Sequence, residues 1–296
     1  MVIEKPHMPY ARIASLTTLA MLAFAGNSLL CRAALKHTTI DAASFTSIRL
    51  ISGALILWLI VRSRQTNASG AGNWLSAFAL FAYAGGFSFA YLSLPAASGA
   101  LLLFGAVQAT MIGYGLWTGE RLQKLQLLGL TLALAGLVGL LLPGLSAPPL
   151  TGALLMIGAG VAWGIYSLRG KGTGDPTRVS AGNFLRAVPM AAGLSIVLWT
   201  DTSMDAAGIA YAIASGALAS GVGYAIWYTA LPGLKASHAA TVQLSVPVLT
   251  AIGGVALLGE AMTLRLTVAS LAILGGIALV ILEKQHTRAP RHTGPE

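Results

Sequence analysis

Long apolar blocks follow one another along most of this chain, separated by short polar connections. Crossing the hydrocarbon layer of a membrane takes about 20 apolar residues in a helix. Blocks of that length predict ten membrane-spanning helices, at residues 12–34, 42–62, 74–93, 98–118, 123–142, 150–169, 178–200, 207–230, 236–258 and 263–282. A connection as short as residues 95–97 requires neighbouring spans to run antiparallel. We therefore expect an all-α polytopic membrane protein without a separate soluble domain.

Composition agrees with the pattern, since 56% of residues are hydrophobic and only 9% are charged. A soluble domain carries roughly 25% charged residues. In a soluble protein the net charge of +9 would suggest nucleic-acid binding, but here membrane topology explains it better. The single cysteine, Cys31, excludes an internal disulfide. The N-terminal residues run into the first apolar block without a small-residue cleavage site, which predicts a retained helix rather than a signal peptide.

The basic residues are distributed unevenly between the two sides of the predicted membrane. With the N-terminus inside, the cytoplasmic segments hold Lys5, Arg12, Arg62, Arg64, Arg121, Lys124, Arg169, Lys171, Arg178, Lys235, Lys284, Arg288 and Arg291. The outer side holds only Arg32, Lys36 and Arg265, while Arg49 and Arg186 fall within spans. Basic residues in short loops mark the cytoplasmic side. This bias predicts that both termini are cytoplasmic.

The second half of the chain repeats features of the first, 137 positions later. The aligned pairs are Arg32 and Arg169, Arg49 and Arg186, Tyr91 and Tyr228, and Pro95 and Pro232. Each copy has five spans, an odd number, so the second copy enters the membrane from the opposite side. We expect two inverted five-helix repeats, residues 1–145 and 146–296. Such repeats are typical of secondary transporters, which bind substrate between the halves. The alternative is a duplicated scaffold without transport activity.

Several motifs carry a resemblance to a known family. They are a Gly-Glu pair after spans four and nine, ending at Glu120 and Glu260, the stretch "VPVLTAIGGVALLGEAMT" (246–263) and "AWGIYSLRG" (162–170). The chain resembles the drug/metabolite transporter superfamily, EamA type, and within it is similar to YddG-like exporters of aromatic and other amino acids. The first half departs from the family pattern, because Val107 and Gln108 stand where span nine has Pro247.

This resemblance implies a bacterial inner-membrane exporter of small metabolites. It also implies a central cavity lined by spans one, three, four, six, eight and nine, with spans five and ten at the periphery.

Aromatic residues form two stripes at helical spacing. Tyr83, Phe87 and Tyr91 recur every four residues in span three, and Tyr224 and Tyr228 do so in span eight. Residues four apart share one face of a helix. The two stripes are expected to flank a shared cavity suited to apolar or aromatic substrates. The alternative is an interfacial belt or packing against lipid.

Polar residues at membrane depth are further candidates, because an unpaired polar group is costly there. Asn27, Ser28, Gln108 and Gln243 either bond a neighbouring helix or face the cavity. Trp163 is a cavity candidate beside Gly160 and Gly164, whose spacing is typical of a close helix crossing. For His238, a packed or interfacial position is favoured over proton coupling.

Two charged residues lie inside predicted spans. Arg49 and Arg186 indicate either anion recognition or capping of a neighbouring helix by bonds to its last carbonyl groups. Their symmetric placement favours capping, since one substrate carboxylate needs one arginine. Two prolines, Pro189 and Pro247, are expected to interrupt spans seven and nine, as gating helices often allow.

The leading functional hypothesis is an alternating-access exporter of aromatic and other hydrophobic amino acids. No carboxylate lies in the middle of a span, so we expect movement down the substrate gradient or weak coupling by another route. The sequence has no phosphate-binding loop for ATP, and we expect no cofactor, no metal, no catalytic residue and no nucleic-acid partner. The expected partners are the small-molecule substrate and the lipid bilayer, with the protein a monomer.

The alternatives within transport are a nucleotide-sugar or phosphorylated-metabolite carrier and a multidrug exporter. A structural or sensing protein is the alternative outside transport. An intramembrane enzyme is disfavoured, because His238 has no evident catalytic partner.

Overall fold

The computed structural model describes residues 9–64, 70–119, 121–144, 147–170, 174–234 and 236–286. Within these ranges the regular secondary structure is entirely helical. The single-segment helices are α1 (Tyr10–His37), α2 (Ala42–Ser63), α3 (Trp74–Tyr91), α4 (Ala96–Trp117), α5 (Lys124–Leu141), α6 (Leu150–Arg169), α7 (Pro176–Val197) and α12 (Leu264–His286).

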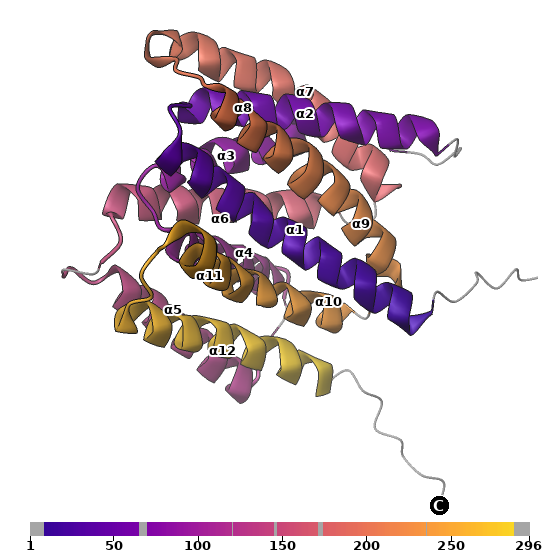
Figure 1. Cartoon of the computed structure of the whole chain (residues 1–296). Coiled ribbons are helices and arrows are strands. Elements are labelled where there is room, and N and C mark those ends of the chain that lie inside the picture. The colour runs from indigo at the N-terminus through magenta and orange to yellow at the C-terminus, as the bar shows by residue number, and fades with distance from the viewer. Residues whose placement is uncertain are drawn as a thin grey trace, which may run out of the picture.

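Two further passes through the bundle are composite (Figure 1). One consists of α8 (Ala206–Ile213), a π-helical segment η2 (Ala214–Val222) and α9 (Gly223–Ala230), followed by the short 3-10 turn η3 (Leu231–Gly233). The other consists of α10 (Ala236–Gln243) and α11 (Ser245–Leu258). The predicted spans and the observed helices therefore agree within a few residues, and the all-α polytopic fold is confirmed.

The seventh predicted span differs from the others in composition. Nine described segments are long and apolar enough to cross a membrane, and α7 is not among them. Its first half carries Arg178, Asn183 and Arg186, which lower its hydropathy. The helix still runs beside α2 along one edge of the bundle (Figure 1). It therefore occupies the position expected of the seventh span, although it is more polar than the other spans.

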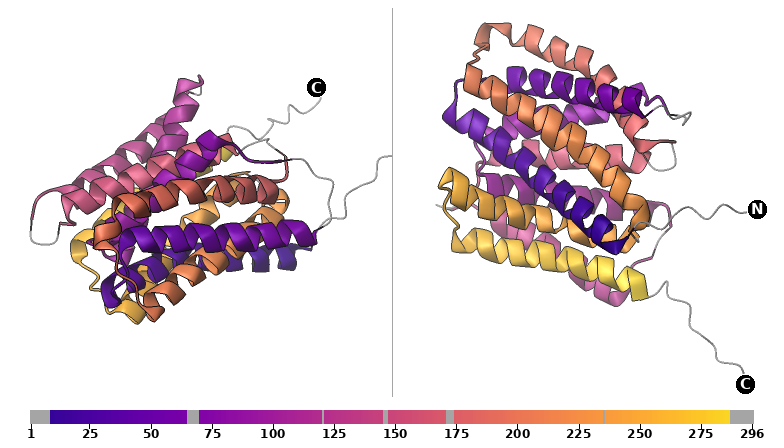
Figure 2. Two further views of the ribbon diagram at one scale, coloured as in Figure 1. Left: turned by 90° about the horizontal axis from the view of Figure 1, so that it is seen from above. Right: turned by 45° about the vertical axis from the view of Figure 1, so that its right-hand side comes forward.

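The helices pair in a way that leaves six passes in the centre. At one edge of the bundle α2 packs on α7, and at the other α5 packs on α12 (Figure 1). Between the two pairs, α6 packs against α3 and α4, while α1 packs against α9, η2 and α11. In Figure 2 the start of α1 and the end of α12 lie at one end of the bundle. We call this end the terminus side and the opposite end, where α1 finishes and α2 begins, the far side.

Hydrogen bonds from one carboxylate fix the start of α2 on the far side. Asp41 Oδ1 accepts from the backbone N–H groups of Ala43 and Ser44 at 2.9 and 2.8 Å. Its Oδ2 accepts from Ser203 N at 3.0 Å, in the loop before α8. Burial by itself would raise the pKa of Asp41, but these hydrogen bonds outweigh it and lower the pKa below its ordinary value. The cap therefore stabilises the fold above about pH 4, and this contribution is lost as the pH falls through the lowered pKa.

The two proline expectations have different outcomes. Pro189 lies inside an uninterrupted α7, so the prediction that it breaks the span is wrong. Span nine does break, at Leu244, between α10 and α11. Pro247 has no N–H with which to bond the carbonyl of residue 243, four positions earlier. The missing bond interrupts the regular helical hydrogen bonding at this point.

The α5–α12 pair depends on two glycines that let the backbones meet. A Cβ placed on Gly276 would collide with the Gly129 carbonyl oxygen and lie 2.7 Å from Ala133 N. A Cβ placed on the neighbouring Gly275 would have no atom within 4 Å. Small residues at such crossings are the usual means by which membrane helices approach closely.

We predict that Gly276→Val separates α5 from α12, because its side chain has to displace backbone atoms. The substitution should lower the midpoint temperature of unfolding in detergent by about 5 °C. The matched control Gly275→Val adds the same side chain in open space and should change the midpoint little. Equal midpoints for the two variants would contradict the close glycine contact.

Candidate functional site

A cavity of about 530 Å³ lies in the centre of the bundle. Its walls come from both halves of the chain, namely from α1, α3, α4, α6, α7, η2, α9, η3 and α10. The family resemblance implied that all of these passes except α7 line the cavity. It also implied that spans five and ten lie at the periphery, and α5 and α12 contribute no lining residue.

Most of the residues expected in the cavity line it. The nine are Asn27, Ser28, Tyr83, Phe87, Gln108, Trp163, Tyr224, Tyr228 and Gln243. They come from six separate helical passes, so tertiary packing brings them together. The two aromatic stripes of spans three and eight therefore meet in one chamber, although Tyr91 does not take part.

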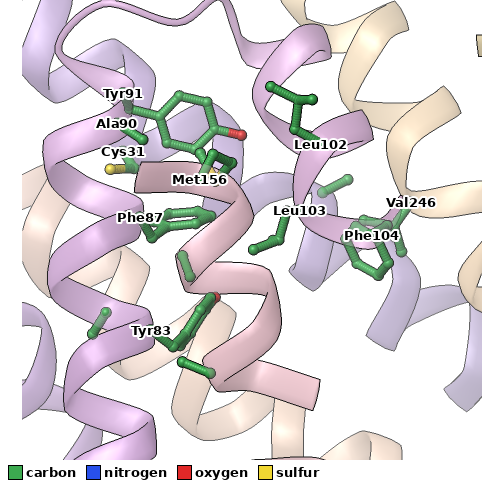
Figure 3. Packing of buried hydrophobic residues seen from close by; sticks show 14 of the residues in the cluster. Cys31, Tyr83, Phe87, Ala90, Tyr91, Leu102, Leu103, Phe104, Met156 and Val246 are labelled. Carbon is green, nitrogen blue, oxygen red and sulfur yellow. The ribbon is translucent and has the colours of Figure 1, made fainter. Parts of the chain in front are cut away.

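Tyr91 and His238 lie outside the lining. Tyr91 is fully buried and packs against Gly99 at the start of α4. Its hydroxyl donates to the Ala96 carbonyl oxygen at 3.3 Å, so the residue fastens the α3–α4 hairpin. His238 is exposed on α10. Figure 3 shows Tyr83, Phe87 and Tyr91 one above another along α3, with Tyr91 at the end away from Tyr83.

The aromatic rings of the cavity form a connected group around Trp163. The Trp163 ring centroid lies 4.8 Å from that of Tyr83 and 5.4 Å from that of Tyr224. It also stacks on Tyr166 at 5.2 Å with an interplanar angle of 27°. Aromatic pairs at these separations gain energy beyond the burial of their area. The result is a rigid apolar wall built jointly by α3, α6 and α9.

A hydrogen-bonded chain of polar groups lies beside this wall. The Ser215 hydroxyl of η2 donates to Asn27 Oδ1 at 2.7 Å. Asn27 Nδ2 donates to the Tyr83 hydroxyl oxygen at 3.3 Å. Arg49 Nη2 donates to the same oxygen at 3.0 Å. Asn27 thus both bonds neighbouring helices and faces the cavity, the two possibilities that its sequence position left open.

The two arginines inside predicted spans have different surroundings. The Arg186 guanidinium donates to the carbonyl oxygens of Ala71, before α3, and of Gly182 in its own helix. Arg49 is 1% exposed, and its guanidinium carbon lies 5.1 and 4.8 Å from the ring centroids of Tyr83 and Phe87. Neither carbonyl that Arg186 bonds lies at the last turn of a neighbouring helix, so Arg186 does not make the capping bonds that its position suggested. Arg49 lies directly behind the cavity wall.

Several lining residues were absent from the sequence prediction. The main ones are Phe24, Phe104, Tyr166, Ser180, Asn183 and Trp227. Tyr166 lies three residues after Trp163, on the same helical face, so the spacing could have identified it. Ser180 and Asn183 belong to α7, which the resemblance did not place at the cavity. Their hydrogen bonds to the Tyr166 hydroxyl, at 3.4 and 3.5 Å, arise only from packing.

The cavity extends toward the terminus side. Its lining includes Ser167 and Gly170 at the end of α6, Pro176 at the start of α7, and Leu231 and Leu234 after α9. All of these residues lie at helix ends on the terminus side. At the far side the lining stops at Asn27, Ser28, Phe87 and Leu103, well inside the bundle.

An ion pair joins the helices on the far side. Arg32 Nε lies 2.9 Å from Glu260 Oε1, with side-chain exposures of 12% and 8%. Glu260 Oε2 accepts from Ala96 N at 2.7 Å, and Arg32 Nη1 donates to the Tyr91 carbonyl oxygen at 2.8 Å. These bonds tie α1 and α11 to the α3–α4 hairpin. They lie between the far side and the point where the cavity lining stops.

Glu260 reaches this position because α11 ends in a glycine. Gly259 adopts a φ of 62°, a left-handed conformation that favours glycine. The Glu260 N–H then bonds back to the Gly254 carbonyl oxygen at 3.0 Å. The Gly-Glu pair is therefore a helix end that presents a carboxylate. The equivalent Glu120 lies outside the described residues.

Comparison with known proteins decides the family. The model of the EamA-like transporter family matches residues 150–282. An uncharacterised protein of Pseudomonas aeruginosa, PA1977, is 61% identical over 256 residues, which cover 86% of this chain and 89% of that protein. The chain belongs to the EamA-like transporter family. It is therefore a multi-pass membrane protein of the drug/metabolite transporter superfamily, and its relatives indicate a transporter rather than an enzyme.

Other relatives of this EamA-like chain include exporters. The threonine/homoserine exporter RhtA of Salmonella typhimurium is 32% identical over 142 residues, covering 44% of this chain and 46% of that protein. The Escherichia coli RhtA is 34% identical over 122 residues, covering 38% and 39%. A membrane metabolite exporter with a small-molecule substrate is therefore supported. The closer similarity to YddG-like exporters stays a prediction.

A solved crystal structure shares the fold of the EamA-like chain. The TM-score is 0.67, with 93% of this chain and 99% of the other covered. At 20% sequence identity this similarity concerns the fold alone.

We predict that the cavity of this EamA-like protein admits water-soluble reagents. In a Cys31→Ser background, Val107→Cys should react with a small polar maleimide about tenfold faster than Leu94→Cys, because thiol reactivity requires access. Val107 and Leu94 are similarly buried, at 2% and 0% exposure, but only Val107 lines the cavity. Equal labelling rates, measured by mass spectrometry of the purified protein, would contradict an accessible cavity.

Proposed function

We propose that this protein is an alternating-access exporter of amino acids, aromatic and other hydrophobic ones among them, in the bacterial inner membrane. The observation that carries the proposal is the aromatic-walled cavity, which reaches one side of the bundle while a network of bonds seals the other. A cavity accessible from one side at a time is what alternating access requires.

The size and chemistry of the cavity suit an amino acid. A volume of about 530 Å³ falls within the range of about 300–1,000 Å³ that is usual for small-molecule sites. The ring group around Trp163 supplies apolar contact, while Asn27, Gln108 and Gln243 supply amide hydrogen bonds. The RhtA relatives are named as exporters of threonine and homoserine. These two substrates have the same amino and carboxylate groups as hydrophobic amino acids. The aromatic wall favours larger side chains.

The packing of the helices supports an inverted-repeat architecture, with residues 1–145 and 146–296 as the two copies. In an inverted repeat, each helix of one copy corresponds to a helix of the other, so their contacts should also correspond. The α3–α6 contact corresponds to the contact of α9 and η2 with α1, and the α4–α6 contact corresponds to that of α11 with α1. The α2–α7 and α5–α12 pairs map onto themselves. Two equivalent halves would provide two equivalent gates, one on each side of the cavity.

The distribution of basic residues supports a cytoplasmic location for the terminus side. In that orientation the cavity faces the cytoplasm, and the Arg32–Glu260 pair closes the outer gate. An exporter loads its substrate in this state. The cytoplasmic gate would then form on the terminus side, where Arg169 already approaches Ser76 Oγ at 3.3 Å and Asn73 Oδ1 at 3.4 Å.

We predict that proteoliposomes containing the purified protein take up labelled L-phenylalanine, L-leucine and L-threonine without a proton gradient. Trp163→Ala should reduce uptake about tenfold, because it removes the centre of the aromatic wall. Trp199→Ala, at a ring that is 73% exposed, is the matched control and should leave uptake unchanged.

Failure of all three amino acids to enter would contradict the proposed substrate class. Uptake of nucleotide sugars or of cationic drugs instead would favour a phosphorylated-metabolite carrier or a multidrug exporter, respectively. Accumulation that requires a proton gradient would contradict movement down the substrate gradient alone.

We predict that Glu260→Gln weakens the outer gate, because it removes the charge that pairs with Arg32. If the substitution destabilises the sealed conformation by about 1.4 kcal/mol, the equilibrium between sealed and open conformations shifts about tenfold. When Glu260→Gln is added to the Cys31→Ser, Leu94→Cys variant, the rate of maleimide labelling at position 94 should rise about tenfold. Lys36→Met is the control, since Lys36 on the same face donates to the Leu258 carbonyl oxygen at 3.2 Å and does not pair with Glu260. Labelling that does not change with Glu260→Gln would show that the ion pair is not the gate.

A further inference from the structure

Arg49 holds a charge at membrane depth without an anionic partner among the described residues. It is 1% exposed, and the ion pair that the described residues form joins Arg32 to Glu260 instead. Two of its nitrogen atoms, Nε and Nη1, are buried without a hydrogen-bond partner in the part of the chain that the structure describes. Its Nη2 donates to the Tyr83 hydroxyl, and its guanidinium lies over the faces of the Tyr83 and Phe87 rings. A buried charge is costly unless it is paired, so this arrangement calls for a functional explanation.

The Tyr83 hydroxyl connects this charge to the cavity. Its oxygen accepts one hydrogen bond from Arg49 Nη2 and another from Asn27 Nδ2. Asn27 is held in that orientation because its Oδ1 accepts from the Ser215 hydroxyl at 2.7 Å. A phenol that accepts at its oxygen still has its own O–H to donate. Tyr83 lines the cavity, and neither of the two bonds that its oxygen accepts uses its own proton.

The same chain of bonds strengthens this donor. Hydrogen bonds polarise one another, and a bond to an ionised group is roughly twice as strong as a neutral one. The guanidinium behind the phenol also places positive potential on the cavity wall. None of the residues that line the described cavity is an aspartate or a glutamate. Near Tyr83 the local field therefore favours an anionic group over a cationic one.

The geometry points to the Tyr83 hydroxyl, supported by Arg49, as the receptor for a carboxylate group of the transported molecule. The substrate class is then a carboxylate with an apolar body, which would lie against the aromatic wall around Trp163. This inference rests on the proposed function, because it assigns the chemistry of the cargo in the same cavity. Arg49 acts through Tyr83 and is a positioning residue, whereas Arg186 bonds carbonyl groups of the protein.

Equilibrium binding to the purified full-length protein in detergent micelles tests the inference independently of transport. The probes are 3-phenylpropionate and its neutral analogue 3-phenylpropanamide, which share one apolar body. We expect the carboxylate to bind at least about tenfold more tightly than the amide, since charge-assisted hydrogen bonds are the strong ones. Tyr83→Phe should weaken binding of the carboxylate about tenfold and binding of the amide much less, because only the carboxylate loses a charge-assisted hydrogen bond.

Tyr228→Phe is the matched control, because it removes another hydroxyl from the cavity lining. It should preserve the preference for the carboxylate. In Arg49→Leu the preference should disappear, and if that variant fails to fold, Tyr83→Phe still decides the question. Equal affinity of wild type for the two probes, absence of carboxylate binding, or an unchanged preference in Tyr83→Phe would each overturn the inference.

The transport assay separates the two proposals. Preferential binding of the carboxylate without uptake of any amino acid would overturn the proposed function and leave the carboxylate receptor standing. Amino-acid uptake by a protein that binds both probes equally would overturn the receptor alone.

Discussion

Backbone hydrogen bonding in the absence of water governs this structure. Within a bilayer each N–H and C=O group has to find a partner inside the protein, so the chain is helical wherever it contacts lipid. Irregular backbone is tolerated only where protein or a cavity surrounds it. The two irregular passes follow this rule. The π-helical segment places Ala219 and Ser220 at the cavity wall, and the break at Leu244 directly follows the lining residue Gln243. The departures from regular helix are therefore found where the site is.

Close packing of small residues makes those departures possible. A Cβ on Gly216 of η2 would collide with the Arg49 carbonyl oxygen and with the Ser52 side chain. A Cβ on Gly221 would collide with the Ile56 side chain. The wide π turn thus lies directly against α2, and its Ser215 hydroxyl donates to Asn27 of α1 at 2.7 Å. The polar chain that ends at Tyr83 depends on a backbone approach that only glycine permits.

Under the two proposals above, the charged groups of the bundle fall into two kinds, one that closes a gate and one that recognises the substrate. Arg32 and Glu260 satisfy each other at a helix end, where water can reach them when the pair separates. Arg49 lies deeper, against aromatic rings, and its charge is directed to a hydroxyl in the cavity wall. A transporter needs both kinds, because a gate has to break and reform whereas a recognition site has to keep its geometry.

The sequence by itself determined the helical passes, their antiparallel order and nine residues of the cavity lining. These features follow from local periodicity, because apolar length sets a span and a four-residue spacing sets a face. The tertiary structure alone decided the rest. Tyr91 shares the spacing of Tyr83 and Phe87, yet the tight α3–α4 hairpin at Gly99 buries it. The polar residues of α7 reach the cavity because α7 packs on α2 and α3. Arg49 and Arg186 look equivalent in the repeat, but their partners come from other helices and loops, and no local pattern encodes which acceptors those segments bring.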